Sequence, residues 1–245
     1  MNFLSHHHVA RLVAGNDDAS PAFFLGNVLP DLMPRPTAPG TGRRLRARHV
    51  AGKAAPPPTP LVHGVRLHLA SDRAFHGSPV FQAATSEAGR LLADTAFVRP
   101  LRRVFFLAHI FVELALDAAL VRTEDPGVAD HLYDQFDRAD LAELAKEVEA
   151  LLGHPTPGLP DALERFARAR FLFEYQSDLG LAQSLARIAA RAGVLSPEPL
   201  NGSRQTHRDA ARLAALFADF VPRAACEFGP HLWQPPASTV PEPEW

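Results

Sequence analysis

Two sets of side chains that can bind metal ions share the spacing of one helix face. The first set is His68, Asp72 and His76. The second set is His109, Glu113 and Asp117. Residues four positions apart project from nearly the same face of an α-helix, so each set forms a row along its helix. We therefore expect two helices that present these rows toward each other, as in sites built inside helical bundles.

The N-terminal part of the chain adds three further candidate ligands. His6 and His8 flank His7 in the opening MNFLSHHHVA, and Asp31 ends the apolar segment FFLGNVLPD. His7 is expected to face solvent. All the candidate ligands are imidazoles and carboxylates, without a thiolate, which suits manganese, iron, zinc or magnesium better than a soft metal. One or two such ions are expected.

A pair of divalent ions would suit the hydrolysis of a phosphoester. Bound metal lowers the pKa of water and stabilises both oxygens of an in-line phosphoryl displacement. Asp72 and Asp117 are the candidate catalytic carboxylates, and Arg66 and Arg73 are candidates to stabilise charge on the phosphoryl group. The alternative for the same rows is a structural network of hydrogen bonds and ion pairs in the core.

The composition indicates one ordinary globular domain. The chain has 245 residues, of which 47% are hydrophobic and 21% are charged. A single cysteine, Cys226, excludes an internal disulfide framework and a CxxC zinc ribbon. The formal charge of -2 provides no excess of positive charge for binding DNA. No uninterrupted apolar run is long enough to span a membrane, and the opening residues do not have the pattern of a secretory leader. We therefore expect a cytoplasmic protein without a membrane span.

The hydrophobic periodicity is helical almost throughout and predicts an all-α bundle of about seven to nine helices over residues 1–233. Ser78 and Pro79 are typical of a helix start, and Gly193 and Pro222 are typical of helix ends. The helices expected from the pattern cover residues 78–95, 101–122, 160–175, 179–192 and 203–221. The acid-rich stretch 124–149 is expected to form a solvated helical face.

Two segments are expected to lie outside the helical core. Residues 34–59 are rich in proline, glycine and alanine, which is typical of a long exposed loop, and residues 234–245 have the composition of a disordered tail. No acidic residue occurs between positions 32 and 71. The basic side chains of this loop could attract an acidic or phosphate-bearing partner, and they are Arg43, Arg44, Arg46 and Arg48.

Four stretches of this sequence resemble the acyl carrier protein phosphodiesterases, also called holo-acyl-carrier-protein hydrolases. They are MNFLSHHHVA, FFLGNVLPDLMPR, HGVRLHLASD and VELALDAAL. The positions that carry the resemblance are His6, His8, Gly26, Asn27, Asp31, Gly64, His68, Asp72, Glu113, Asp117 and Leu120. The resemblance implies an all-α fold related to the HD-domain phosphohydrolases.

The resemblance also implies an activity and a partner. The family hydrolyses the phosphodiester that joins 4′-phosphopantetheine to a serine of acyl carrier protein, commonly with manganese. Two positions depart from the family pattern: Ala118 replaces a histidine, and His76 replaces an acidic residue. We expect His109 to supply the missing imidazole. The alternatives are a related hydrolase of nucleotides or other small phosphoesters, and a non-catalytic helical binding protein.

Overall fold

The computed structural model describes residues 2–15, 19–33, 58–93, 104–192 and 204–236, with side chains from residue 210 onward in the last range. Within these ranges 86% of the residues are helical and no strand occurs, which confirms the all-α class. The described part contains eleven α-helices, more than the seven to nine expected. The arginines of the predicted basic loop and the position of Gly193 lie outside the described residues.

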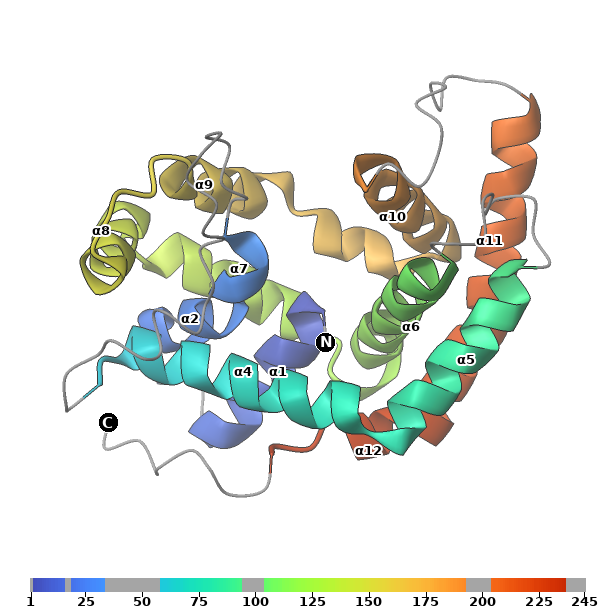
Figure 1. The fold of residues 1–245 in the computed structure, drawn as a ribbon, viewed down its shortest axis with the longest axis horizontal. Helices are drawn as coiled ribbons and strands as arrows, with labels where there is room; N and C mark the ends of the chain where they lie inside the picture. Colours follow the sequence, from blue (N-terminus) through green and yellow to red (C-terminus); the bar gives the residue numbers. More distant parts are fainter. Residues whose placement is uncertain (1, 16–18, 34–57, 94–103, 193–203, 237–245) are drawn as a thin grey trace.

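The N-terminal half of the chain supplies five helices (Figure 1). They are α1 (Phe3–Ala14), α2 (Pro21–Leu32), α4 (Pro60–Gly77), α5 (Pro79–Ala93) and α6 (Val104–Ala119). The later helices are α7 (Val128–Arg138), α8 (Leu141–Leu152), α9 (Leu159–Ala169), α10 (Asp178–Arg191), α11 (Arg204–Arg223) and α12 (Gly229–Leu232). Shorter helical turns cover Leu120–Glu124, Phe171–Gln176 and Ala224–Phe228.

Helix α6 lies in the centre of the core and packs against α1, α5, α10 and α11 (Figure 1). Every residue from Phe111 to Ala119 is buried, and the Phe111 ring stacks on Phe217 with centroids 4.2 Å apart. Among the described residues, Val104–Glu124 is the one stretch apolar and long enough to cross a membrane. Because 72% of its most apolar window is buried inside the protein, this length and composition are equally those of a core helix.

Several helix ends differ from the sequence expectation. Ser78 does precede α5, and its Oγ accepts a hydrogen bond from the Val80 N–H, as predicted. The helix expected over 160–175 breaks at Arg170, which has a φ of 49°. Pro222 lies inside α11 instead of after it, and a π-helical turn follows directly. A proline removes one backbone donor, and a helix can absorb that loss by a kink or a π-turn without ending.

The acid-rich stretch 124–149 is also divided more finely than expected. It forms α7 and α8, which are separated at Ala139 and Asp140. The Asp140 carboxylate starts α8 by accepting hydrogen bonds from two backbone N–H groups. One acidic residue of the stretch is therefore a helix cap, and the break raises the helix count.

Helices α2 and α4 cross at van der Waals contact of their backbones because glycines occupy the crossing. A Cβ added at Gly64 would lie 2.0 Å from the Phe23 carbonyl oxygen, and one added at Gly26 would lie 2.3 Å from the Leu61 carbonyl oxygen. No side chain fits at either position. His68 lies one turn after Gly64 on α4. The close crossing therefore sets the distance between His68 and the α2 residues Asn27 and Asp31.

We predict that Gly64→Ala lowers the free energy of unfolding by about 2–3 kcal/mol, because the methyl group forces the two backbones apart. Gly77→Ala is the matched control on the same helix, since nothing lies within 4 Å of a Cβ added there. Urea denaturation followed by circular dichroism measures both. Equal stability of the two variants would contradict the close crossing.

Candidate metal site

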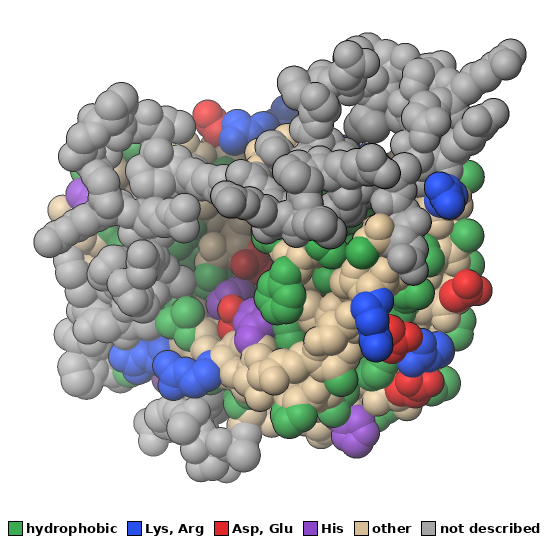
Figure 2. Space-filling model, turned by 45° about the vertical axis from the view of Figure 1, so that its right-hand side comes forward, with side chains coloured by type: hydrophobic (Ala, Val, Ile, Leu, Met, Phe, Trp, Pro, Cys, Tyr) green, Lys and Arg blue, Asp and Glu red, His purple; other side chains and the backbone are tan. Residues whose placement is uncertain are grey.

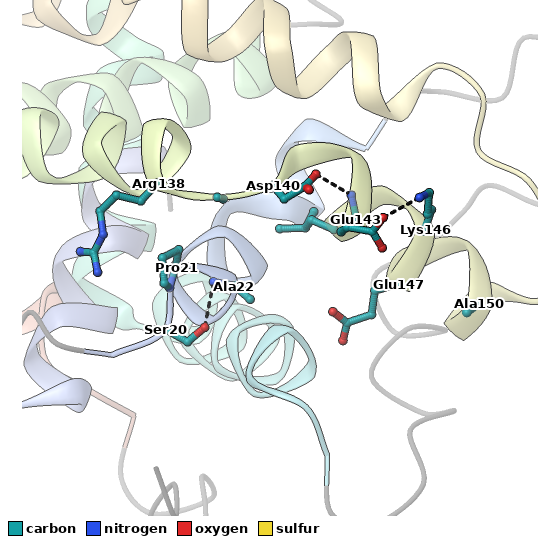
Figure 3. Close-up of a pocket in the computed structure, with 11 residues that line it drawn as sticks. Ser20, Pro21, Ala22, Arg138, Asp140, Glu143, Lys146, Glu147 and Ala150 are labelled. Atoms are coloured by element: carbon teal, nitrogen blue, oxygen red, sulfur yellow. Dashed lines mark hydrogen bonds and ion pairs between the residues drawn. The ribbon is translucent and has the colours of Figure 1, made fainter.

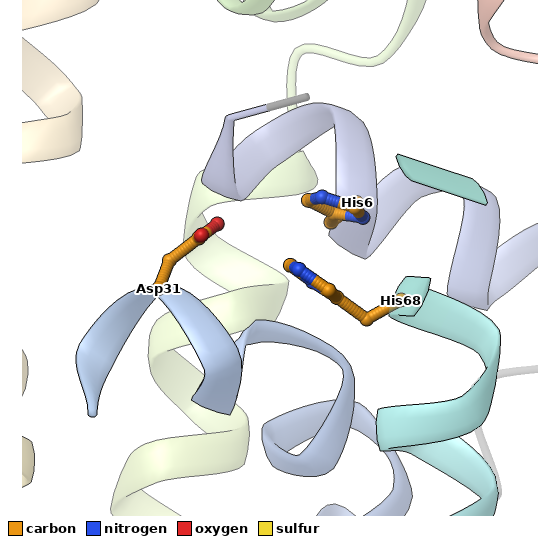
Figure 4. A group of neighbouring side chains, drawn as sticks. All are labelled: His6, Asp31 and His68. Atoms are coloured by element: carbon orange, nitrogen blue, oxygen red, sulfur yellow. The ribbon is translucent and has the colours of Figure 1, made fainter. Parts of the chain in front are cut away.

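Three helices bring one ligand each into the first group of candidate metal ligands. His6 comes from α1, Asp31 from α2 and His68 from α4, and one ligand atom of each lies within 4.8 Å of the others. Figure 4 shows the three side chains directed toward a common space. The two imidazole rings stack with centroids 3.8 Å apart and an interplanar angle of 20°. The residues are 25 or more positions apart in sequence, so the fold assembles this group.

Asn27 fixes the orientation of the first group. The His68 Nδ1–H donates a hydrogen bond to the Asn27 carbonyl oxygen at 2.8 Å, which leaves the Nε2 lone pair available as a ligand. The Asn27 side-chain amide donates to the His6 carbonyl oxygen at 2.5 Å. One residue of α2 thus ties α1 and α4 together. The resemblance includes Asn27 without giving it a role, although a lone amide in the apolar segment FFLGNVLPD is a usable signal of a buried hydrogen-bonding residue.

His6 is fully buried, yet neither of its ring nitrogens has a hydrogen-bond partner among the described residues. Its Nε2 lies 3.5 Å from the Asp72 carboxylate, at ion-pair distance. An unsatisfied buried polar group costs about 1–3 kcal/mol, so such groups in a folded protein call for an explanation. A cation held by the His6 imidazole would supply the missing partner.

The second group consists of His76, His109 and Glu113. The Nε2 atoms of His76 and His109 lie 3.3 and 3.1 Å from the same Glu113 oxygen. Their rings stack with centroids 4.7 Å apart, and the edge of Phe81 packs against both. Glu113 is buried, whereas the two histidines are partly exposed. This group is therefore hydrogen-bonded internally and open to solvent on one side.

Asp72 lies between the two groups. One carboxylate oxygen is 3.5 Å from His6 Nε2 in the first group, and the other is 3.6 Å from His76 Nδ1 in the second. Residues His68 and His76 are two helical turns apart, or about 12 Å along the axis, so one ion cannot bind both. The carboxylate in the middle of the row therefore contacts an imidazole of each set.

Burial and pairing set the protonation states of the site. Burial lowers the pKa of His6 to about 4 and lowers that of His68 well below its ordinary value, so both imidazoles are neutral. Burial acts to raise the pKa of Asp72 and Glu113, but nearby positive charge and hydrogen bonds, among them those with histidines, together outweigh it and keep both carboxyls ionised. Neutral imidazoles and ionised carboxylates are the forms that bind metal ions.

Asp31 behaves differently from the other carboxylates. The residue as a whole is exposed, but loss of solvent around its carboxyl group and the nearby carboxylates of Glu113 and Asp72 raise its pKa above the ordinary value. Like charges at short range disfavour ionisation of a further group. A bound cation would reverse this effect and favour the ionised form.

Asp117 lies outside both groups, although it ends the second predicted row. It is fully buried, and its oxygens accept hydrogen bonds from the Leu4 N–H at 3.0 Å, the Ser5 N–H at 2.9 Å and the Ser5 hydroxyl at 2.6 Å. Burial raises its pKa to about 7, against the effect of these three donors. Asp117 caps the N-terminus of α1 and thereby positions His6, in place of the ligand role expected for it.

The other two histidines of the N-terminal run do not join either group. His8 pairs with Asp125 at 3.0 Å, beside Arg11. His7 was expected to face solvent, and this is wrong: it is fully buried and hydrogen-bonded to His131 at 2.7 Å. Adjacent helical residues project about 100° apart, so three consecutive histidines on a helix packed on several sides point in three directions.

Arg66 and Arg73 both start from the face of α4 opposite His68. At about 100° per residue they lie roughly 160° and 140° around the helix from that histidine. Arg73 is exposed and Arg66 is partly exposed. Ala118, where the resemblance predicts a histidine, is fully buried in the core. His109, expected to replace that histidine, does lie in the second group.

The site opens on one face of the protein. Figure 2 shows histidine and acidic side chains together in a hollow, beside apolar side chains. A separate groove of about 600 Å³ lies between the start of α2 and α8 (Figure 3). Most of its charged residues are already engaged, since Asp140 caps α8, Lys146 pairs with Glu143, and Glu147 accepts a hydrogen bond from the Thr59 hydroxyl. That groove contains none of the predicted site residues.

Comparison of the chain with protein families, with characterised proteins and with solved structures gives no match.

We predict that Asp117→Asn lowers the free energy of unfolding by about 2–3 kcal/mol, because an amide places a donor against the N–H groups of α1. Its metal content should equal that of the wild type, since Asp117 contributes no ligand. Asp161→Asn, on the exposed start of α9, is the control and should change stability by less than about 0.5 kcal/mol. Loss of metal without loss of stability would restore Asp117 as a ligand.

The buried His6 should also produce a pH dependence of stability in protein kept metal-free with a chelator. Its pKa is about 4 in the folded chain, against 6.5 as the ordinary value. Between these values the unfolded chain binds a proton that the folded chain does not, so stability is full above pH 6.5 and falls as the pH drops toward 4. This group accounts for about 3 kcal/mol of that fall.

Urea denaturation of the wild type and of His6→Gln at several pH values measures the contribution. The glutamine variant should lose less stability across the same interval, by the amount assigned to His6. Identical pH profiles would show that His6 is not buried in its neutral form.

Proposed function

We propose that the chain is a divalent-metal-dependent phosphodiester hydrolase of the acyl carrier protein phosphodiesterase type, with an HD-like helical scaffold. The observation that carries the proposal is the position of Asp72 between two groups of imidazole and carboxylate ligands. A carboxylate with a ligand set on either side is suited to binding two cations at once. Two-metal sites of this kind favour in-line displacement at phosphorus.

The donor atoms fit the proposed metal ions. The first group offers His6, Asp31 and His68, and the second offers His76, His109 and Glu113. A purely structural network would not need two features of the first group. Neither ring nitrogen of His6 has a hydrogen bond within the described part of the chain, since its Nε2 has only the 3.5 Å ion-pair contact with Asp72, and the Nε2 of His68 is oriented with its lone pair available. Nitrogen and oxygen donors without sulfur suit manganese, which the resemblance also implies, and admit iron, zinc or magnesium.

The chain's own residues have separable tasks in this proposal. Asn27 orients the His68 ring by a hydrogen bond. Asp117 binds the first turn of α1 and so fixes the position of His6. Phe81 packs against the rings of His76 and His109 and limits their rotation. A bound divalent ion would supply an acidified water and charge neutralisation at the phosphoryl oxygens. Arg73 is exposed on the outer face of α4 and is assigned no contact with the phosphoryl group.

The substrate follows from the resemblance. It implies the phosphodiester of holo-acyl carrier protein, a partner that is small and acidic. The arginines at 43, 44, 46 and 48 are proposed to attract it by electrostatic steering. A nucleotide or another small phosphoester is the alternative substrate, and a substrate assay separates the two.

A second candidate function rests on the hydrogen bonds inside the second group. Glu113 accepts from both His76 and His109, so this group is satisfied without a cation. A helical binding protein with a structural polar core would have such a network throughout. The orphaned nitrogens of His6 favour the hydrolase over this alternative.

We predict that the purified wild type binds one or two equivalents of divalent metal and that Asp72→Asn loses at least one of them. Elemental analysis by mass spectrometry after manganese loading measures both. Removing the metal should lower the stability of the wild type by about 3 kcal/mol when the ion was present at 100 times its dissociation constant. Asp134→Asn, exposed on α7, is the matched control and should keep the metal.

The same proteins then test the activity. The wild type should release 4′-phosphopantetheine from holo-acyl carrier protein in preference to hydrolysing free nucleotides, and Asp72→Asn should lose at least about a hundredfold in turnover. A preference for nucleotides would assign the alternative substrate. Absence of metal binding, with wild-type stability unaffected by a chelator, would support the structural core and exclude the proposed hydrolase.

A further inference from the structure

A cavity of about 450 Å³ opens between α5 and α6, directly beside the second ligand group. Helix α5 contributes Phe81 and Thr85, and helix α6 contributes Phe105 and His109, each pair four residues apart. Both pairs therefore form stripes that face each other across the cavity. His76, at the end of α4, lies at the same side as His109 and connects the cavity to the site.

The walls of the cavity are aromatic. Phe81 is 4% exposed and packs edge-on against the rings of His76 and His109, with centroids 5.3 and 5.0 Å away. Phe105 is 71% exposed and is among the most exposed large hydrophobic residues of the described chain. An apolar wall of this kind favours a ligand that removes the Phe105 ring from water.

Thr85 adds a polar group inside these walls. Its side chain is buried, with 2% exposure, and its hydroxyl has no hydrogen-bond partner among the described residues. Leaving a buried hydroxyl unsatisfied costs about 1–3 kcal/mol. Thr85 lines the cavity, so an occupant whose hydrogen-bonding group reaches this buried hydroxyl can satisfy it.

The remaining lining side chains carry no charge. They are Gln82 and Ser86, on the exposed side of α5, and the Ser86 hydroxyl is engaged with the Gln82 carbonyl oxygen at 2.9 Å. Among the residues that the structure describes, none that lines the cavity is a carboxylate, a lysine or an arginine. An ionised occupant would lose hydration without gaining a counter-charge beyond the two histidines, whereas a neutral occupant would not.

We propose that this cavity binds the uncharged organic group of the substrate, an aromatic or alkyl group that carries one hydrogen-bonding function such as an amide. Thr85 provides the hydrogen bond, and Phe81 and Phe105 provide the apolar contact. The link to a phosphoester rests on the proposed function, because it requires the phosphoryl group to lie at the neighbouring ligand groups. The cavity would then select phosphoesters whose organic group is neutral and mainly apolar over phosphoesters whose organic group carries a charge of its own.

Two neutral probes of similar size test the cavity without any turnover. Acetanilide has an aromatic ring and an amide, whereas ethylbenzene has the ring and no hydrogen-bonding group. Binding of each to the full chain is titrated by saturation-transfer NMR in the presence of a chelator. The wild type should bind both. Phe105→Ala should weaken the binding of both by about fivefold or more, since apolar contact is lost.

Thr85→Val removes the hydroxyl and keeps the shape of the side chain. It should weaken acetanilide binding by about fivefold and leave ethylbenzene binding within about twofold. Thr85→Ser should retain acetanilide binding. Ala83→Ser, at an exposed position of the same helix that is not among the described lining residues, is the control and should leave both probes unaffected. Thermal unfolding by circular dichroism checks that each variant is folded.

The inference is overturned if the wild type binds neither probe, or if Phe105→Ala binds both as the wild type does. Equal weakening of both probes by Thr85→Val would also overturn the role of its hydroxyl. Because the titrations are done without metal, they fail or succeed independently of the hydrolase. If the protein binds the probes but has no phosphodiesterase activity, the cavity is supported as a binding site and the proposed function is rejected. If it has the activity but binds neither probe, only the proposal for the cavity is rejected.

Discussion

A fully buried imidazole without a hydrogen-bonded ring nitrogen is the constraint on which the account of this protein depends. His6 lies against the ring of His68 and at 3.5 Å from the Asp72 carboxylate, and burial keeps it neutral. Without a further partner this arrangement opposes folding, since buried polar groups need partners. With a cation the neutral nitrogens and the ionised carboxylates become complementary. The second group, which is hydrogen-bonded internally, does not impose the same requirement.

The surrounding helices are arranged so that this imidazole keeps its place. Asp117 binds the first turn of α1 from the buried helix α6, and Asn27 joins α1 and α4 through α2. The crossing of α2 and α4 at Gly26 and Gly64 brings the backbones close enough for the Asn27 contacts. Core packing and site geometry therefore depend on the same few residues. A substitution at the glycine crossing is expected to affect both.

The sequence predicts the class of the fold and the rows of ligands, because both follow from local periodicity. The four-residue spacing correctly places His68, Asp72 and His76 on one face of α4. The same spacing is misleading for Asp117. About 12 Å separates it from His109 along the helix, and its position against the start of α1 is a tertiary contact. His7 and Asn27 show the same limit, since their burial depends on which helices pack around them. The HD-like arrangement stays a prediction.

The most direct test of the two-ion account is anomalous X-ray diffraction from crystals of the manganese-loaded protein, recorded above and below the manganese absorption edge. Two anomalous peaks are expected, one on each side of the Asp72 carboxylate. One peak should contact His6, Asp31 and His68, and the other should contact His76, His109 and Glu113. A loaded crystal with no peak next to Asp72, and with His6 still buried and unpartnered, would contradict the central claim.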